Sequence, residues 1–241
     1  MQRNVKRDTR SEIILIGCNM FLEQGYSKAS TAEMCRELGI STGNFNFYFP
    51  KKENLLAVLV EELCEFQWDL MEKEAQEGVS SLLAYCLELT SMVSACEQDE
   101  VARDFFVSAY SNYLSLDIIR RNDMQKMRKV FAPYCQEWSE ERFNETEDLV
   151  SGIEFAALMT TSTSSKLEVR IELALRTILA LYGVPKDLIE VKIMKVLAMD
   201  YASIGIRILQ RFKEYINDKH VEVLEEFKKR RARYLREKNK K

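Results

Sequence analysis

Apolar residues recur every three or four positions along most of the chain, which is the spacing of one face of an α-helix. In the first such stretch the repeat runs through Ile13, Ile16 and Met20. It predicts a helix over residues 9–24, which Gly25 ends. No stretch shows the apolar–polar alternation of a strand, and no internal repeat is visible. The pattern therefore predicts an all-α protein.

Two much shorter helices are expected after the first. Residues 30–33, Ser-Thr-Ala-Glu, have the spacing of a capping box, in which the first and fourth side chains satisfy free backbone amides. They predict the start of a second helix, which Gly39 ends. Ser41 can cap a third helix, and Pro50 closes it. Three helices joined in this way form a helix-turn-helix.

A long amphipathic helix is predicted from Glu53 to about Gln76, and further helices follow along the rest of the chain. The polar turn around residues 121–123 predicts a break between two of them. The C-terminal helical region is expected to bend near Gly205 or near residues 217–218. The helices beyond the fourth are expected near residues 79–96, 99–113, 121–140, 145–161, 167–182 and 187–236.

Residues 13–56 resemble the DNA-binding domain of the tetracycline-repressor (TetR) family of bacterial transcription regulators. The resemblance lies in the order and spacing of three segments, "FLEQGYSKAS", "MCRELGISTGNF" and "FYFPKKENLL". It implies an N-terminal three-helix helix-turn-helix domain over residues 1–52 and a larger helical ligand-binding and dimerisation domain over residues 53–241. It also implies a DNA-binding transcriptional regulator, a repressor that binds a palindromic operator as a homodimer and is released by a small-molecule ligand.

The resemblance assigns the DNA contacts to one short segment. A short capped helix can enter the major groove and offer its first turn to base edges. Gly43 would allow close backbone approach, while Thr42 and Asn44 can hydrogen-bond bases. Phe45 and Phe49 are expected to anchor the helix in the core. The expected DNA-binding residues are Ser41, Thr42, Gly43, Asn44, Asn46, Phe47, Tyr48, Lys51 and Lys52.

The chain departs from the family pattern at Asn46, where the family usually has a tyrosine whose hydroxyl reaches a phosphate. Asn46 either reads a base, because asparagine pairs bidentately with adenine, or faces phosphate or solvent. Phe47 is expected either as an apolar contact at the edge of the groove or as a core residue. Tyr48 and Lys52 match phosphate-contacting positions of the family, and such contacts raise affinity without reading sequence.

The charges are unevenly distributed. Residues 1–52 carry 8 basic and 5 acidic side chains, a net charge of +3. Residues 53–219 carry 18 basic and 29 acidic side chains, net −11, and residues 220–241 carry 9 basic and 4 acidic, net +5. An acidic body repels DNA, so one end of the molecule is expected to dock while the rest stands clear. Each basic end is interpreted either as a contact to an anionic partner or as a solvated terminus.

The composition argues against catalysis. The chain has one histidine, His220, so a Ser–His–Asp triad, a Cys–His pair or a multi-histidine metal site is not expected. The carboxylates of Glu61, Glu62 and Glu65 are better explained as the solvated face of the fourth helix than as an acid–base site. We therefore expect no enzyme, no metal and no cofactor. A helical module that reads a protein partner is the second alternative to a regulator.

The cellular location can be addressed from composition. No apolar run approaches the roughly 18 residues of a membrane span, so no membrane association is expected. The N-terminus lacks the apolar segment of a secretory leader. The six cysteines show no CxxC pair and are expected as reduced, small apolar residues in a cytoplasmic protein.

Two further surfaces are expected in residues 53–241. An adaptable apolar cavity for an unidentified small molecule would draw on methionine and aromatic side chains between helices, although such a stripe can equally be core. These side chains are Trp68, Met71, Tyr85, Phe106, Tyr110, Met127, Phe131 and Tyr134.

The helices over 145–161 and 167–182 resemble the dimer-forming pair of the family, and their small residues would allow close helix approach. Ordinary packing within one chain is the alternative. The expected dimer-interface residues are Leu149, Ile153, Ala156, Ala157, Leu167, Ile171, Ala174 and Ile178.

Overall fold

The computed structural model describes residues 8–76, 80–161 and 163–238, and every regular element within these ranges is a helix. The predicted all-α class is therefore confirmed for the described part of the chain. The helices are α1 (Thr9–Gln24), α2 (Thr31–Leu38), α3 (Thr42–Tyr48), α4 (Lys52–Gln76), α5 (Ser81–Gln98), α6 (Glu100–Ser111), α7 (Tyr113–Phe131), α8 (Glu140–Leu158), α9 (Leu167–Leu181), α10 (Lys186–Leu197), α11 (Tyr201–Lys219) and α12 (Val221–Lys238).

The first four helices lie where the sequence predicts them, and their capping residues act as expected. The Ser30 hydroxyl accepts a hydrogen bond from the Glu33 amide at 3.1 Å. The Ser41 hydroxyl accepts one from the Asn44 amide, also at 3.1 Å. Gly39 ends α2 with a φ of 63°, a left-handed conformation that glycine adopts without steric cost. Local signals alone therefore position the helix-turn-helix.

Two predicted helix boundaries are wrong. The polar residues 121–123 do not interrupt a helix, because α7 runs through them and the Asn122 side chain donates to the Ile118 carbonyl at 2.9 Å. The break lies earlier, at Asn112, whose side chain accepts from the amides that open α7. The C-terminal helical region is not one bent helix but three, with breaks before Tyr201 and at His220.

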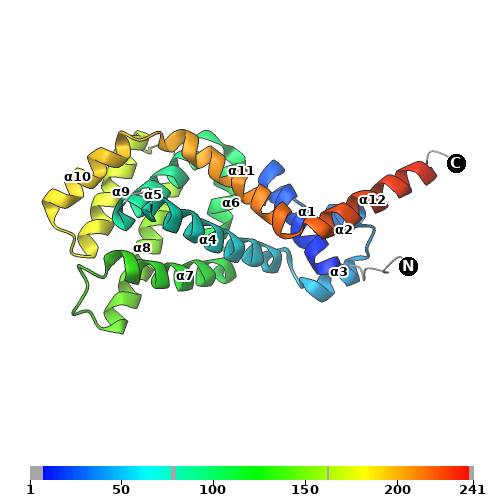
Figure 1. Cartoon of the computed structure of the whole chain (residues 1–241), viewed down its shortest axis with the longest axis horizontal. Helices are drawn as coiled ribbons and strands as arrows, with labels where there is room; N and C mark the ends of the chain where they lie inside the picture. Colours follow the sequence, from blue (N-terminus) through cyan, green and yellow to red (C-terminus); the bar gives the residue numbers. More distant parts are fainter. Residues whose placement is uncertain (1–7, 77–79, 162, 239–241) are drawn as a thin grey trace.

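The molecule is elongated, with α1, α2 and α3 at one end and α9 and α10 at the other (Figure 1). Helix α4 leaves α3 and runs toward the middle, where it packs along α7. Helix α11 returns along α5 toward the first end, and α12 packs against α1. Helices α1 and α12, the first and the last, consequently lie at the same end of the molecule.

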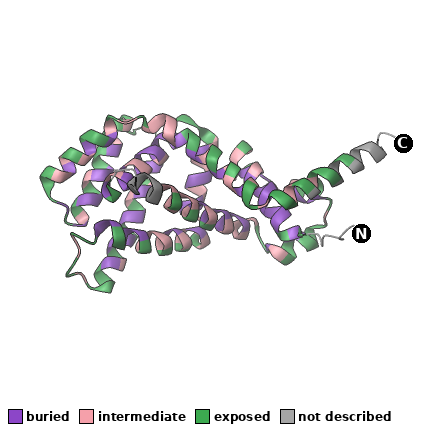
Figure 2. Cartoon of the chain, in the orientation of Figure 1, coloured by how far each residue is buried: buried purple, intermediate pink, exposed green. Residues whose placement is uncertain are grey.

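Helix α1 is enclosed by its neighbours rather than lying on the surface (Figure 2). Four consecutive residues, Ile13 to Ile16, are buried because α1 contacts α2, α4, α6, α11 and α12. At Gly17 an added Cβ would lie 2.5 Å from a Leu55 methyl carbon, so α1 and α4 require glycine at this contact. The helix-turn-helix therefore shares one continuous core with the helices that follow it.

None of the helices in the described ranges combines the length and apolar composition needed to cross a membrane.

Candidate functional site

Helix α3 is short but firmly held. The rings of Phe45 and Phe49 are almost completely buried, at 0% and 2% exposure, and lie 6.1 Å apart between centroids. The Ser41 hydroxyl caps the first turn. Seven residues are too few for a helix that is stable in isolation, so these contacts fix both its existence and its orientation.

The opposite face of α3 is open to solvent. Thr42, Gly43, Asn44 and Asn46 are all exposed. Phe47 is 80% exposed, and its only ring neighbour among the described residues is Tyr48, edge-on at 5.0 Å. The interpretation of Phe47 as a core residue is therefore wrong. The Phe47 ring and the polar groups beside it are therefore free to contact a partner in solution.

Gly43 is not required by the fold. A Cβ added there would meet only the Ser41 hydroxyl oxygen, at 3.8 Å, which is ordinary van der Waals contact. Its backbone lies in a right-handed helix, where alanine is favoured over glycine by about 1 kcal/mol. The isolated chain thus gives no reason for a glycine at this exposed position.

The two lysines after Pro50 differ in what they contact. Lys51 is exposed, and its backbone amide donates to the Asn54 side chain at 3.0 Å. The Lys52 ammonium instead donates to the carbonyls of Tyr26 and Ala29, at 2.8 Å and 3.0 Å.

The same ammonium lies 4.1 Å from the centroid of the Tyr26 ring, and partial burial lowers the pKa of Lys52. The expected role of Lys52 as mainly a phosphate contact is thus corrected. It ties α4 to the turn between α1 and α2, because the carbonyls of that turn lack helical partners.

The turn between α1 and α2 is also held from α6. The Asp104 carboxylate accepts from the Ser27 amide at 2.7 Å and from the Ser27 hydroxyl. Gly25, in this turn, has a φ of 90°, and an added Cβ would lie 2.6 Å from the Asp104 carboxylate. We call residues 25–30 the α1–α2 turn. Lys52 of α4 and Asp104 of α6 thus both hydrogen-bond to the α1–α2 turn.

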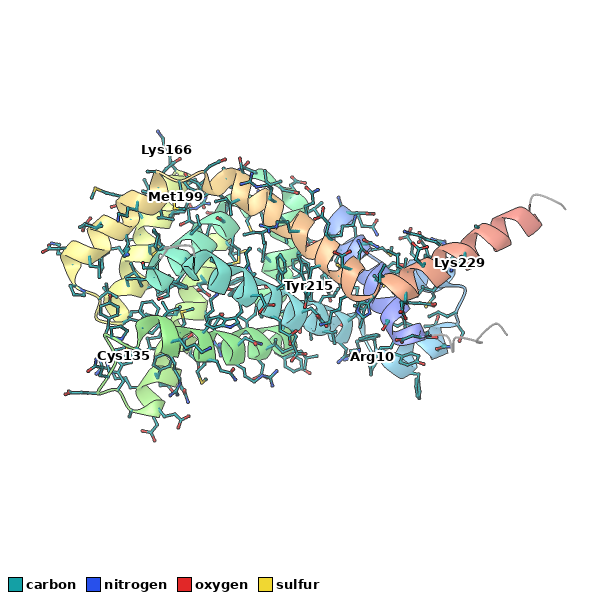
Figure 3. All side chains as sticks on the ribbon, viewed as in Figure 1. Arg10, Cys135, Lys166, Met199, Tyr215 and Lys229 are labelled. Atoms are coloured by element: carbon teal, nitrogen blue, oxygen red, sulfur yellow. The ribbon has the colours of Figure 1, made fainter. Side chains whose placement is uncertain are left out.

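Of the basic residues toward the two ends of the chain, Arg10 and Lys229 are described and lie at this end of the molecule. Arg3, Lys6 and Arg7 fall outside the described residues, while the Arg10 guanidinium lies 5.6 Å from the Phe49 ring centroid (Figure 3). Helix α12 packs against α1 and bears Lys229 on the same end of the molecule.

A cavity lies between α4, α5, α6, α7 and α8. Tyr85, Phe106 and Tyr110 line it, as the sequence predicts. About 40 Å³ of it is accessible to the centre of a water molecule. A neighbouring space of about 150 Å³, on the side of Trp68, shares several of its lining residues. We call the two spaces together the effector cavity.

The wall of the effector cavity carries ionisable groups that the sequence analysis did not single out. The Glu154 carboxylate accepts from the hydroxyls of Tyr85, at 3.0 Å, and Tyr110, at 2.9 Å. Lys126 pairs with Glu88. These groups come from four helices, so no local sequence pattern could have grouped them.

Burial and carboxylate crowding shift the protonation of this cluster. Burial raises the pKa of Glu154, although its two tyrosine hydrogen bonds oppose the shift. Burial, followed by repulsion from Glu154, holds the pKa of Asp123 well above its ordinary value. Burial and the neighbouring carboxylates raise the pKa of Glu147 to about 9. Carboxylates outnumber the single buried lysine, so their mutual repulsion adds to the effect of burial in raising these pKa values.

The remaining aromatic and methionine predictions for this cavity are corrected. Met127 and Phe131 are core residues, at 1% and 0% exposure, and the Phe131 ring stacks on Tyr182 at 3.7 Å. Tyr134 follows α7 and also lies outside the cavity lining. Met71 lies outside the residues whose side chains are described. The stripe was core at these positions because it faces α8 and α9.

Residues 13–59 match the family model described as bacterial regulatory proteins, tetR family. Residues 13–59 are therefore similar to the N-terminal domain of tetR-family regulators. The chain's N-terminal three helices and the start of α4 are the part that the match covers, which includes the whole exposed face of α3.

Two individual proteins are similar to this chain. The HTH-type transcriptional regulator HbdR of Aromatoleum sp. (strain CIB) is 30% identical over 115 residues, 47% of this chain and 48% of HbdR. The match thus spans about half the length of that relative. The crystal structure of RolR in complex with resorcinol shares 18% identity, covering 77% of this chain and 92% of RolR, with a TM-score of 0.62. This likeness shows a shared fold.

The prediction of dimer-interface residues is corrected on α8 and α9. Ala157, Ile171, Ala174 and Ile178 are buried, with exposures from 0% to 7%, inside their own chain. They form the strong apolar stripe of the sequence because they pack on the core, and Leu167 is half-buried beside them. The exposed apolar residues lie on the other face of the two helices: Leu149, Ala156, Met159, Val169 and Leu173, with Ile153 half-buried.

The other sequence expectations have simple outcomes. All six cysteines are free, and burial raises the pKa of Cys18, Cys86 and Cys96 to about 12, which makes them unreactive. No group of histidine, cysteine, aspartate and glutamate side chains in the described ranges could hold a metal ion. Glu62 and Glu65 of α4 pair with Lys219.

Proposed function

We propose that this chain is a DNA-binding transcriptional repressor, with residues 1–52 as the DNA-binding domain and residues 53–241 for dimerisation and ligand binding. It would bind a palindromic operator as a homodimer and be released by a small molecule. The observation that carries the proposal is the face of α3. It is exposed, polar and aromatic, on a helix anchored from behind, within the segment that matches the tetR-family model.

Helix α3 has suitable dimensions and chemistry for the major groove. That groove is roughly 12 Å wide and presents hydrogen-bonding base edges together with thymine methyl groups. Asn44 and Asn46 can each pair with adenine, and the exposed Phe47 ring suits a thymine methyl. Lys51 and Tyr48, beside this face, can contact phosphates. Gly43 would let the backbone approach the DNA closely. This would explain why glycine occupies a position where the fold alone does not require it.

A homodimer would form through the exposed apolar faces of α8 and α9. Leu149 is 60% exposed and Leu173 is 63% exposed, although each lies on a helix whose other face is deep in the core. Two-fold pairing would set two α3 helices to read half-sites about 34 Å apart, or a multiple of that spacing. Two short helices read enough bases for specificity where one does not.

The α1–α2 turn supplies a route from the effector cavity to the DNA-binding helices. Phe106 lines the cavity on α6, two residues from Asp104, which holds Ser27 of the turn. Lys52, which holds the same turn, lies at the start of α4, whose later residues also line the cavity.

A ligand that separates α4 from α6 would therefore move the two attachments of the turn apart. It would favour a conformation in which the two α3 helices miss adjacent grooves. The loss of operator-binding free energy would equal the difference between the ligand's binding free energies for the two conformations. RolR, which shares the fold, is solved with resorcinol, and this supports a small ligand.

Selection of bound sequences from a random DNA pool tests the proposal directly. The expected result is a palindrome with half-sites one or two helical turns apart, bound with strong salt dependence. A gel shift on the selected sequence then provides the assay for release by candidate ligands. Failure to enrich any sequence, or binding that is insensitive to salt, would contradict the proposal and favour a module that reads a protein partner.

A further inference from the structure

A second hollow lies between α4, α5 and α11, apart from the effector cavity. About 270 Å³ of it is accessible to the centre of a water molecule, which exceeds both parts of the effector cavity. An apolar protein cavity of about 150 Å³ can hold benzene, so this hollow can hold a ligand of roughly ten heavy atoms. We call it the α11 hollow.

The backbone packing of α11 on α5 frames the α11 hollow. At Gly205 an added Cβ would lie only 2.2 Å from the Ser91 carbonyl oxygen, so the two helices touch backbone to backbone there. Beside this crossing the floor and walls are apolar. They are formed by Leu70, Ala84, Leu87, Met199, Ile204 and Ile208, with Met199 at the turn that leads into α11 (Figure 3).

Two arginines line the α11 hollow without a counter-charge. Arg207 and Arg211 lie one turn apart on α11, are exposed, and have no ion pair among the described side chains. Other cations of the same helix are paired, since Lys213 contacts Glu23 at 2.5 Å and Lys219 contacts Glu62. Like charges four residues apart repel each other, so the arrangement is unfavourable until an anion joins it.

A buried hydroxyl provides an independent sign of a missing partner. Ser91 is fully buried at 0% exposure, lines the α11 hollow, and its hydroxyl has no hydrogen-bond partner. Buried hydroxyls are normally satisfied, because leaving one unpaired loses its hydrogen bonds with water. An oxygen acceptor on a bound molecule would satisfy it.

From these features we propose that the α11 hollow binds a small amphiphilic anion, with an apolar body inside and an oxyanion head at Arg207 and Arg211. Guanidinium groups bind carboxylate and phosphate oxygens through paired, charge-assisted hydrogen bonds. Among the described residues that line the hollow the one carboxylate is Glu88, which is already neutralised by Lys126. The site goes beyond the proposed repressor function and does not depend on DNA binding.

The charge of the ligand distinguishes this hollow from the effector cavity. Gln67 and Glu88 line both spaces, so they share a wall. The described lining of the first space of the effector cavity contains no arginine, and its one cation, Lys126, is already paired with Glu88. An anionic amphiphile should therefore select the α11 hollow, while a neutral one of equal size should not discriminate between the two.

The test is binding of octanoate to the full-length protein without DNA, measured by calorimetry and thermal unfolding. Octanamide serves as a neutral probe of the same shape and octylammonium as a cationic one. We expect saturable binding of octanoate, at least tenfold tighter than that of either other probe. Absence of octanoate binding up to millimolar concentration, or equal affinity for octanamide, would overturn the proposal.

Variants locate the bound octanoate. The double change Arg207→Gln and Arg211→Gln should weaken octanoate at least tenfold and leave octanamide unaffected. The matched control is Lys186→Gln with Lys195→Gln, which removes two exposed positive charges from α10 outside the hollow.

Ser91→Ala should leave the free protein at least as stable, because the hydroxyl it removes has no hydrogen-bond partner among the described residues. An unchanged affinity in the folded arginine variant would place octanoate elsewhere and refute the site.

Discussion

The α3 surface and the effector cavity present their polar groups in opposite ways. At the α3 end the polar groups face water on a helix whose apolar side is sealed by Phe45 and Phe49. In the effector cavity they are buried, and Glu154 must take both its hydrogen bonds from tyrosines on two other helices. The α3 surface is thus determined by residues close together in the sequence, whereas the effector cavity is determined by tertiary packing. This difference also implies that pH should affect the two regions differently.

The largest expected effect is a pH dependence of stability that originates in the cavity region. The pKa of Glu147 is raised from 4.5 to about 9 in the folded chain. Between these values the folded state keeps a proton that the unfolded state releases, so stability falls as the pH rises. The loss is at most about 1.4 kcal/mol per pH unit for one such group. Thermal unfolding from pH 6 to pH 9 should show a steadily falling midpoint.

Glu147→Gln should reduce the dependence of the unfolding midpoint on pH, because glutamine carries no titrating proton. The part of that dependence that is due to Asp123 and Glu154 should remain. Glu145→Gln, on the exposed face of the same helix, is the matched control and should leave the slope unchanged. An identical slope in wild type and Glu147→Gln would show that Glu147 titrates normally and would remove the contrast between the two regions.

The next effect separates the two neighbouring lysines at the DNA-binding end. Lys52→Ala should destabilise the protein by about 2 kcal/mol, since it removes hydrogen bonds from a charged donor to two carbonyls. Lys51→Ala should leave the unfolding midpoint unchanged but weaken binding to all DNA sequences. It should also reduce the salt slope by about 1. Denaturant unfolding and salt-dependent gel shifts measure both.

If Lys51→Ala destabilised the fold and Lys52→Ala altered only the salt slope, the assignment of these two roles would be reversed.

An effect of similar or smaller size concerns sequence reading by α3. Asn44→Ala should cost about 1–3 kcal/mol of discrimination at one base pair of each half-site, with little change in stability, because its side chain is exposed. Asn46→Ala provides the comparison. Loss of discrimination at a second base pair would show that Asn46 reads a base, whereas a uniform loss across sequences would assign it to phosphate. Binding measured on operators changed one base pair at a time distinguishes these results.

The contrast between the regions also explains what the sequence could predict. Ser30, Gly39 and Ser41 act on residues two to four positions away, so the helix-turn-helix follows from local rules. Asp123 and Glu154 lie 31 positions apart, on α7 and α8, and line one cavity only because these helices pack together, so no local spacing in the sequence predicts that they do. Lys52 is an intermediate case, because a lysine beside a DNA-binding helix resembles a phosphate contact until Tyr26 and Ala29 are seen to be its partners.

The same lesson applies to α9, where the strongest apolar stripe was expected at a dimer interface. A strong stripe is typical of the face that packs on the protein's own core, and Ile171 and Ile178 are buried there. The weaker opposite face, with Val169 and Leu173, is the one left exposed. Periodicity identifies a buried face but does not say whether it is buried by the same chain or by a partner.

The smallest expected effect, on Gly43, tests whether the α3 surface is shaped for a partner rather than for the fold. Gly43→Ala should leave the free protein as stable or stabilise it by up to about 1 kcal/mol, because the added methyl has room and alanine favours the helix. The same methyl should weaken operator binding if the DNA backbone or a base edge approaches Gly43 within van der Waals contact. A substitution that raises stability but lowers operator affinity is expected only at a residue that contributes to the DNA complex and not to the fold. Ala substitution at Ser41, which caps α3, should lower both quantities and is the matched comparison. A Gly43→Ala protein that binds the operator as well as wild type would show that DNA does not approach this part of the helix.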